Sequence, residues 1–266
     1  MFRELSNPLM LRLFCQAARY NSGLLARPIP GLSRIIEAIL QDVDARARQQ
    51  LGTSPYQAIA RPSCESVAAA MSKSPRPALP YPEAVAALHA VVPTAPGTPY
   101  DKTPLGVLVS EGLLAEDFVL KGDGRTPSRV VRFAFERISD HLAAEVLLAS
   151  SSDTAGQSKA DIADEIARRL PVADIARKSP NGDRLRTLLE SLAVAAPERV
   201  GVELPGIAEA IKRTDPTLVD RSLESAITEP WLRGLLQREP SSFTDRTRRR
   251  LADLILHSRV ARLSSF

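Results

Sequence analysis

The sequence lacks the residues and motifs on which most catalytic sites are built. It has three histidines and two cysteines among 266 residues, and aromatic residues make up only 5%. No H-x-x-x-H or C-x-x-C pair is present to hold a metal ion, and no G-x-S-x-G segment to present a nucleophile. No Gly-Lys dipeptide occurs, which excludes a Walker A loop. We therefore expect no enzymatic activity in this chain, and no cofactor or metal bound by it alone.

Long apolar runs are also missing, and none approaches the roughly 18 residues that a membrane-spanning helix needs. Cys15 and Cys64 fall on segments with a helical pattern, and two such cysteines exclude a disulfide framework. The sequence thus predicts a cytoplasmic protein without a membrane partner.

What the sequence does contain is helical periodicity, interrupted by 21 prolines and 13 glycines. Few aromatic residues and many breaks favour a mainly α fold over a sandwich or barrel. Residues 82–92 and 103–112 are predicted helices, and a hairpin of strands is predicted at 113–120 and 129–135. Helix, turn, helix and hairpin is the layout of a winged helix.

The predicted winged-helix domain extends over residues 31–150 and includes helices at 33–51 and 56–72. A polar linker at 150–158 separates it from an α-helical repeat region, solenoid-like, at 159–266. Proline breaks suggest separate helices at 217–226 and 230–238 in this region, followed by one at 244–261.

The sequence also predicts the burial or exposure of several individual side chains. Phe133 and Phe135 share one face of the predicted strand, and with Ile138 they are expected in the core. The pair Asp140 and His141 invites a proton-transfer role, but adjacent helical residues do not face each other, which favours two surface positions. Asp44 is expected on the exposed face of the 33–51 helix.

Three segments, in this order, resemble the STAND superfamily of NTPases, the NACHT-like ATPases of signalling and bacterial antiviral defence. NPLMLRLFC at 7–15 is similar to their N-P-L-x-L-x-x-[LF]-C segment. VRFAFERISDHLAA at 131–144 resembles the last strand and helix of their winged-helix domain. PER at 197–199 with GVELP at 201–205 looks like the helical region that follows in the antiviral branch.

The resemblance implies a regulatory or sensor part of an ATP-binding switch, with residues 1–30 closing a helical subdomain of the NTPase. The ATPase core precedes the Asn-Pro-Leu segment in the family, and here only six residues do. ATP or ADP would therefore bind only together with a separate ATPase core, Pro8 packing on the adenine with Asn7 and Leu9 beside it. A phosphate-contacting histidine of some relatives aligns with Phe135 and is lost. Implied partners are that core, homologous protomers and a proteinaceous trigger.

The C-terminal residues 229–266 hold eight arginines and four acids. Arg246, Arg248, Arg249 and Arg250 precede a run of apolar residues with helical spacing, and they are either a solvated face or a docking surface for an acidic partner. Two other functions remain open, a DNA-binding winged-helix regulator and a helical protein-interaction scaffold. Nucleic acid is disfavoured, because the predicted second helix contains no Arg or Lys.

Overall fold

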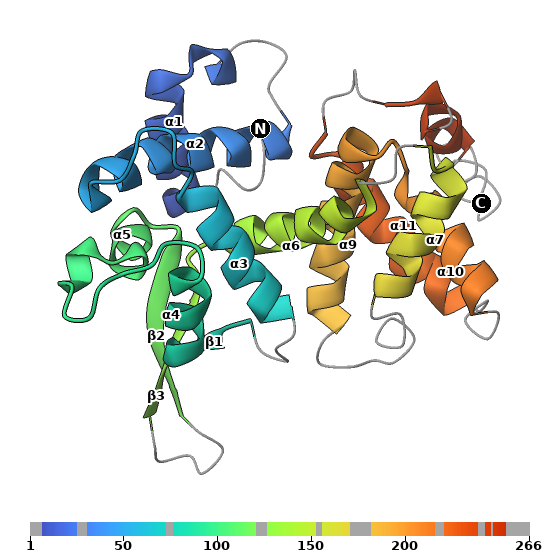
Figure 1. Ribbon diagram of the computed structural model, residues 1–266. Helices are drawn as coiled ribbons and strands as arrows, with labels where there is room; N and C mark the ends of the chain where they lie inside the picture. Colours follow the sequence, from blue (N-terminus) through green and yellow to red (C-terminus); the bar gives the residue numbers. More distant parts are fainter. Residues whose placement is uncertain are drawn as a thin grey trace.

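The computed structural model describes residues 7–25, 31–72, 77–120, 127–152, 156–170, 182–215, 221–238, 243–245 and 247–253. The chain is mainly helical with one small three-stranded antiparallel sheet (Figure 1). The predicted mainly α class is confirmed.

Two helices open the described chain, and each begins or ends where local chemistry dictates. In α1 (Pro8–Tyr20), Oδ1 of Asn7 accepts hydrogen bonds from the N–H groups of Leu9 at 2.9 Å and Met10 at 3.3 Å. Pro8 occupies the first turn, where its missing N–H has no helical partner. A short 3₁₀ turn (Ser22–Leu25) follows, and α2 (Leu32–Leu51) then ends at Gly52 with φ +64°.

The start of α3 is fixed from a distance. Oδ1 of Asp44 in α2 accepts the N–H groups of Ile59 at 2.6 Å and Ala60 at 2.7 Å. Asp44 is buried, so its predicted exposed position is wrong. Because this carboxylate caps the helix, α3 (Ala60–Ser72) begins at residue 60 instead of 56.

The three strands of the sheet follow α3 in the chain and precede α6 (Glu136–Ser152). They are β1 (Leu79–Pro80), β2 (Leu114–Leu120) and β3 (Pro127–Phe133), and their order in the sheet is β1-β3-β2. The hairpin pairs Leu114 with Phe133 and Leu120 with Pro127. The sequence did not predict the two-residue strand β1, which pairs Leu79 with Val131. The other elements of this region are α4 (Tyr81–His89), a 3₁₀ turn (Tyr100–Lys102) and α5 (Pro104–Ser110).

The end of β3 corrects one core prediction. Phe133 and Ile138 are buried as expected. The strand ends at Phe133, however, and Phe135 lies in the bend before α6, where it is only partly buried against the core. The alternation rule does not apply to Phe135, because it lies outside the strand.

The second half consists of α6 (Glu136–Ser152), α7 (Lys159–Arg169), α9 (Gly182–Arg199), α10 (Leu204–Thr214) and α11 (Arg221–Leu235). Pro230 lies inside α11, so the two helices predicted there are one. Close packing accompanies this continuity: a Cβ on Gly234 of α11 would lie 2.5 Å from that of Ala193 in α9. Of the helix predicted at 244–261, the described residues 245 and 247–253 are helical.

Helix α6 belongs to both hydrophobic cores. Ile138 and Leu142 pack with α1 to α5 and the sheet, whereas Ala144 and Leu148 pack with α7, α9, α10 and α11. In Figure 1, α6 runs from the first group of elements to the second. Side chains at the middle of α6 therefore lie where the two halves meet.

Candidate functional site

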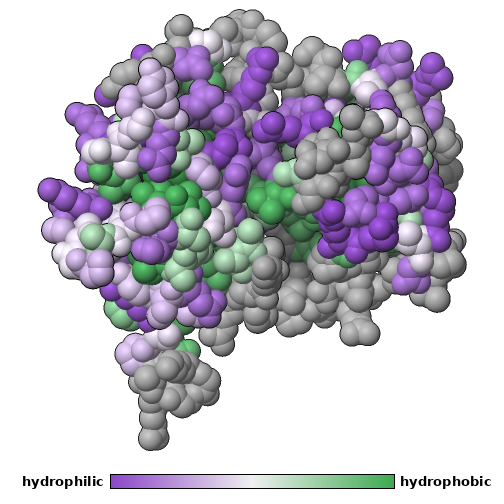
Figure 2. Space-filling model, viewed as in Figure 1, coloured by the Kyte–Doolittle hydropathy of each residue, from purple (hydrophilic) through white to green (hydrophobic). Residues whose placement is uncertain are grey.

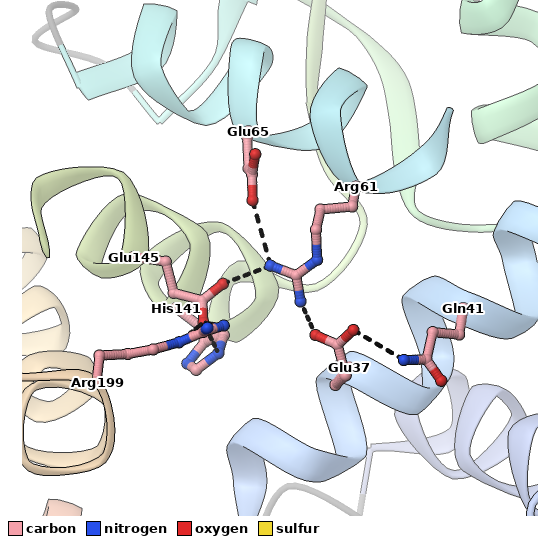
Figure 3. A network of polar contacts seen from close by, with 7 residues as sticks. All are labelled: Glu37, Gln41, Arg61, Glu65, His141, Glu145 and Arg199. Atoms are coloured by element: carbon pink, nitrogen blue, oxygen red, sulfur yellow. Dashed lines mark hydrogen bonds and ion pairs between the residues drawn. The ribbon is translucent and has the colours of Figure 1, made fainter. Parts of the chain in front are cut away.

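A cluster of charged side chains surrounds Glu145 at this meeting point (Figure 3). We call it the junction: Glu37, Gln41, Arg61, Glu65, His141, Glu145 and Arg199. Glu145 of α6 is 8% exposed and is held by one arginine from each half. Arg61 of α3 donates to its Oε2 at 2.7 Å, and Arg199 of α9 donates to its Oε1 through Nε at 3.1 Å and Nη2 at 2.6 Å. One carboxylate thus links three helices.

Arg61 extends the junction to α2. Besides Glu145 it contacts Glu65, one turn along α3, at 3.2 Å. It also pairs with Glu37 of α2, whose Oε1 accepts a hydrogen bond from Gln41 at 3.0 Å. Two arginines face three carboxylates across four helices, so the charges are nearly balanced.

His141 lies one turn before Glu145 on α6, and it is 2% exposed. Its Nε2 lies 3.6 Å from Oε1 of Glu145, and its Nδ1 has no hydrogen-bond partner among the described residues. Burial lowers the pKa of His141 to about 4, against the attraction of Glu145. The histidine is therefore neutral at pH 7. Asp140 is buried as well, so the predicted surface positions for this pair are wrong.

Glu145 itself stays ionised. Burial acts to raise its pKa, but His141 and the hydrogen bonds from Arg199 and Arg61 outweigh it and hold the pKa below its ordinary value. A buried charge of this kind depends strongly on its partners, because removing one leaves an uncompensated charge. The arrangement is suited to keeping the two halves of the chain in one relative position.

A cavity of about 350 Å³ opens beside the junction. Arg61, Glu65, Glu145 and Arg199 line it together with apolar side chains of α6. Figure 2 shows hydrophobic side chains among the hydrophilic ones where α6 crosses toward α9. A backbone hydrogen bond also joins the two halves, since the N–H of Leu32 donates to the carbonyl of Gln237 at 3.0 Å.

The residues implied by the resemblance are not among the junction residues. Asn7 and Pro8 are exposed at the start of α1, and Leu9 packs against the first core. The side-chain oxygen of Asn7 is engaged in capping α1. These positions leave the adenine contact of Pro8 as a prediction that needs an ATPase core.

The C-terminal arginines differ in their exposure and in the residues that they contact. Arg246 lies outside the described residues. Arg248 and Arg249 are exposed, and Arg248 lies 3.5 Å from Asp245. The guanidinium of Arg250 lies 5.6 Å from the ring centre of Trp231, and it lines a second cavity. Within the described chain, Arg250 is therefore set apart from its two exposed neighbours.

Other sites suggested by the sequence receive little support. Helix α5 lies where the second helix of the winged helix was predicted, and it buries Pro104 to Leu108, which does not favour a DNA-reading role. Burial raises the pKa of the Cys64 thiol to about 12, which keeps it protonated at neutral pH. Among the described residues, no cluster of three His, Cys, Asp or Glu side chains could hold a metal ion.

The sequence missed the junction because its members are far apart in the chain. Arg61 and Glu145 are 84 residues apart, and Glu145 and Arg199 are 54 apart. The local signals are three four-residue spacings, of Glu37 with Gln41, Arg61 with Glu65 and His141 with Glu145. Such spacings are common on exposed helices, so they do not mark a site.

Comparisons with protein-family models, with curated proteins and with solved structures found no match. No helix in the described part of the chain is both long enough and apolar enough to span a membrane.

Proposed function

We propose that this chain is the regulatory or sensor part of a STAND-type ATP-binding switch, acting in antiviral defence or signalling in the cytoplasm. In this proposal residues 31–150 form a winged helix and residues 159–266 a solenoid-like helical repeat region. Residues 1–30 close a helical subdomain of the NTPase. The chain is not itself an enzyme, and ATP or ADP binds in an ATPase core that contacts Asn7, Pro8 and Leu9.

The observation that carries the proposal is the order of elements from α3 to β3. Helix, strand, helix, helix and two strands follow one another, and the first strand pairs at the edge of the later hairpin. This order is typical of winged helices. Helix α6 then leads directly into the helical second half, as the resemblance implies.

The junction supplies a mechanism for switching. A switch needs two arrangements of similar free energy, and a ligand or partner favours one of them. Glu145 with Arg61 and Arg199 fixes one arrangement of the halves, and its charges become hydrated if the halves separate. A trigger that binds the separated form would therefore shift the equilibrium.

Nucleotide binding gives the first test. Isothermal titration of the purified chain with ATP and ADP is expected to show no micromolar binding, because the chain has no phosphate-binding loop. Micromolar affinity that depends on a residue outside positions 7–9 would contradict this expectation.

The ATPase partner gives the second test. An antibody against this chain should capture it from its source cells together with a protein, or a longer form of the same polypeptide, that carries a Walker A loop. Glu145→Gln should change the ATP hydrolysis of that assembly severalfold, whereas Glu65→Gln at the same junction should change it little. Capture without any Walker A sequence would favour a plain helical scaffold, and binding of duplex DNA would favour the winged-helix regulator.

A further inference from the structure

A second cavity, of about 420 Å³, lies in the C-terminal half among α7, α10, α11 and the helical residues 247–253. Its volume is in the usual range for small-molecule sites. A smaller cavity of about 80 Å³ adjoins the same residues Glu209, Trp231 and Arg250 and adds Lys212. None of these residues belongs to the junction.

Cations from three separate elements line the larger cavity. Lys159 is the first residue of α7, and within the described chain it makes no ion pair. Arg213 at the end of α10 contacts Asp164 at 2.7 Å, and Arg250 lies against Trp231. Positive groups from unrelated segments of the chain therefore converge on one cavity.

Two carboxylates also line the cavity, and one of them is neutralised. Glu203 accepts hydrogen bonds from Arg238 at 3.0 and 3.1 Å and from Thr247 at 2.7 Å. The side chain of Arg238 is fully buried, so this pair adds no net charge. Glu209 is exposed on α10. Arg213 is paired with Asp164 in the same way, so the cations in excess at the cavity are Lys159 and Arg250, against the single carboxylate of Glu209.

The backbone adds to the positive potential. Helix α10 begins at Leu204, and its first turn lines the cavity through Pro205, which has no N–H, and Gly206, whose N–H donates to the carbonyl of Glu203 at 2.8 Å. The turn therefore contributes its dipole to the cavity, and these two residues add no free backbone donor. The N-terminal end of a helix carries a partial positive charge and is a common place for phosphate and carboxylate groups. The indole N–H of Trp231 also lacks an acceptor among the described residues.

We propose that this cavity binds a small molecule carrying a multiply charged oxyanion, either a phosphate or a polycarboxylate. Lys159, Arg213 and Arg250 receive the anionic group, and Trp231 forms the wall beside it. This site is independent of the proposed switch function, and it assigns to Arg250 a different role from that of the exposed Arg248 and Arg249.

The structure offers a direct readout, because Trp231 is the only tryptophan in the chain. Its fluorescence is to be followed during titration with pyrophosphate and with citrate, at constant ionic strength maintained with sodium chloride. We expect a saturable change with at least one anion and a Kd of about 0.1–1 mM. A preference for pyrophosphate or for citrate then identifies the kind of oxyanion.

Two matched variants decide whether the cavity is responsible. Lys159→Gln removes the unpaired cation, and its Kd should rise about tenfold, the loss expected for one charge-assisted hydrogen bond. Arg249→Gln removes an exposed charge next to Arg250 and should leave the Kd unchanged. Circular dichroism checks the fold of each variant, and isothermal titration repeats the measurement without relying on fluorescence.

The proposal is overturned if neither anion gives a saturable change up to about 10 mM, a concentration at which binding would be too weak to be specific. It is equally overturned if Arg249→Gln weakens binding as much as Lys159→Gln, since this result would mean general attraction to a basic surface. If Lys159→Gln does not fold, Arg213→Gln replaces it in the same comparison. The ATP titration proposed above is best done with the Lys159→Gln variant, so that the two proposals fail independently.

Discussion

The same chemical pair, an arginine and a carboxylate, occurs in two contrasting regions of this molecule. In the junction, the side chain of Glu145 is 9% exposed and arginines from two other helices hold it. On the β2–β3 hairpin, Arg132 and Asp117 lie 3.4 Å apart and their side chains are 45% and 53% exposed. Water screens the second pair and only partly reaches the first. Burial, more than the number of ion pairs, therefore decides which charges control the arrangement of the halves.

The largest effect should come from Glu145→Ala. Removing this carboxylate takes the shared partner from Arg61, whose side chain is 27% exposed, and from Arg199, whose side chain is 55% exposed. The free energy of unfolding should fall by about 3 kcal/mol, the low end of the range for breaking a buried ion pair, because water screens Arg199. Urea denaturation followed by circular dichroism measures the change.

Glu65→Ala is the matched control, because Glu65 contacts Arg61 at 3.2 Å from a more exposed position. This substitution should lower the free energy of unfolding by less than about 1 kcal/mol. Equal losses for the two variants would show that burial does not distinguish the glutamates.

The next effect is a pH dependence that His141 creates. Its pKa in the folded chain is about 4, below the ordinary value of 6.5, so the unfolded chain binds the proton more tightly. Above about pH 6.5, protonation of His141 does not affect the free energy of unfolding. As the pH falls toward 4, that free energy decreases by a total of about 3 kcal/mol. Glu145, whose pKa is also lowered, adds a further loss at the acidic end.

His141→Gln should flatten the stability profile between pH 6.5 and 4. His89→Gln should leave it unchanged, since His89 lies exposed at the end of α4. Denaturation midpoints measured at half-unit steps of pH test both. A wild-type profile that is flat over this range would contradict the burial of a neutral imidazole.

How far the sequence predicted this structure depends on the range of the forces involved. The end of the helix predicted at 33–51 is correct, because a glycine with positive φ such as Gly52 is a local stop signal. Strand β1 was missed, since a two-residue strand exists only through its pairing with β3. Pro230 was read as a break because the packing of α11 on α9 is not visible in the sequence.

The candidate sites were harder to predict than the fold. Asp44 was expected on the exposed face of its helix, and His141 was expected on the surface because it does not face its neighbour Asp140. Tertiary contacts bury both residues. The partners of Glu145 come from segments that no spacing rule connects. Of the arginines identified in the sequence, Arg250 alone lines the second cavity within the described chain, and Lys159 was not identified at all.

The smallest free-energy effect is expected for the exposed ion pair of Arg132 and Asp117 on the hairpin. A double-mutant cycle with Arg132→Ala and Asp117→Ala should give a coupling free energy of about 0.2–1 kcal/mol, because solvent and salt screen the pair. Raising the sodium chloride concentration to about 1 M should remove most of this coupling, since the screening length there falls to about 3 Å. The same cycle on Arg61 and Glu145 should keep most of its coupling in high salt, because the protein surrounds Glu145. If both couplings fall in proportion, the junction is hydrated like the hairpin and cannot hold the halves of the chain together in the way proposed.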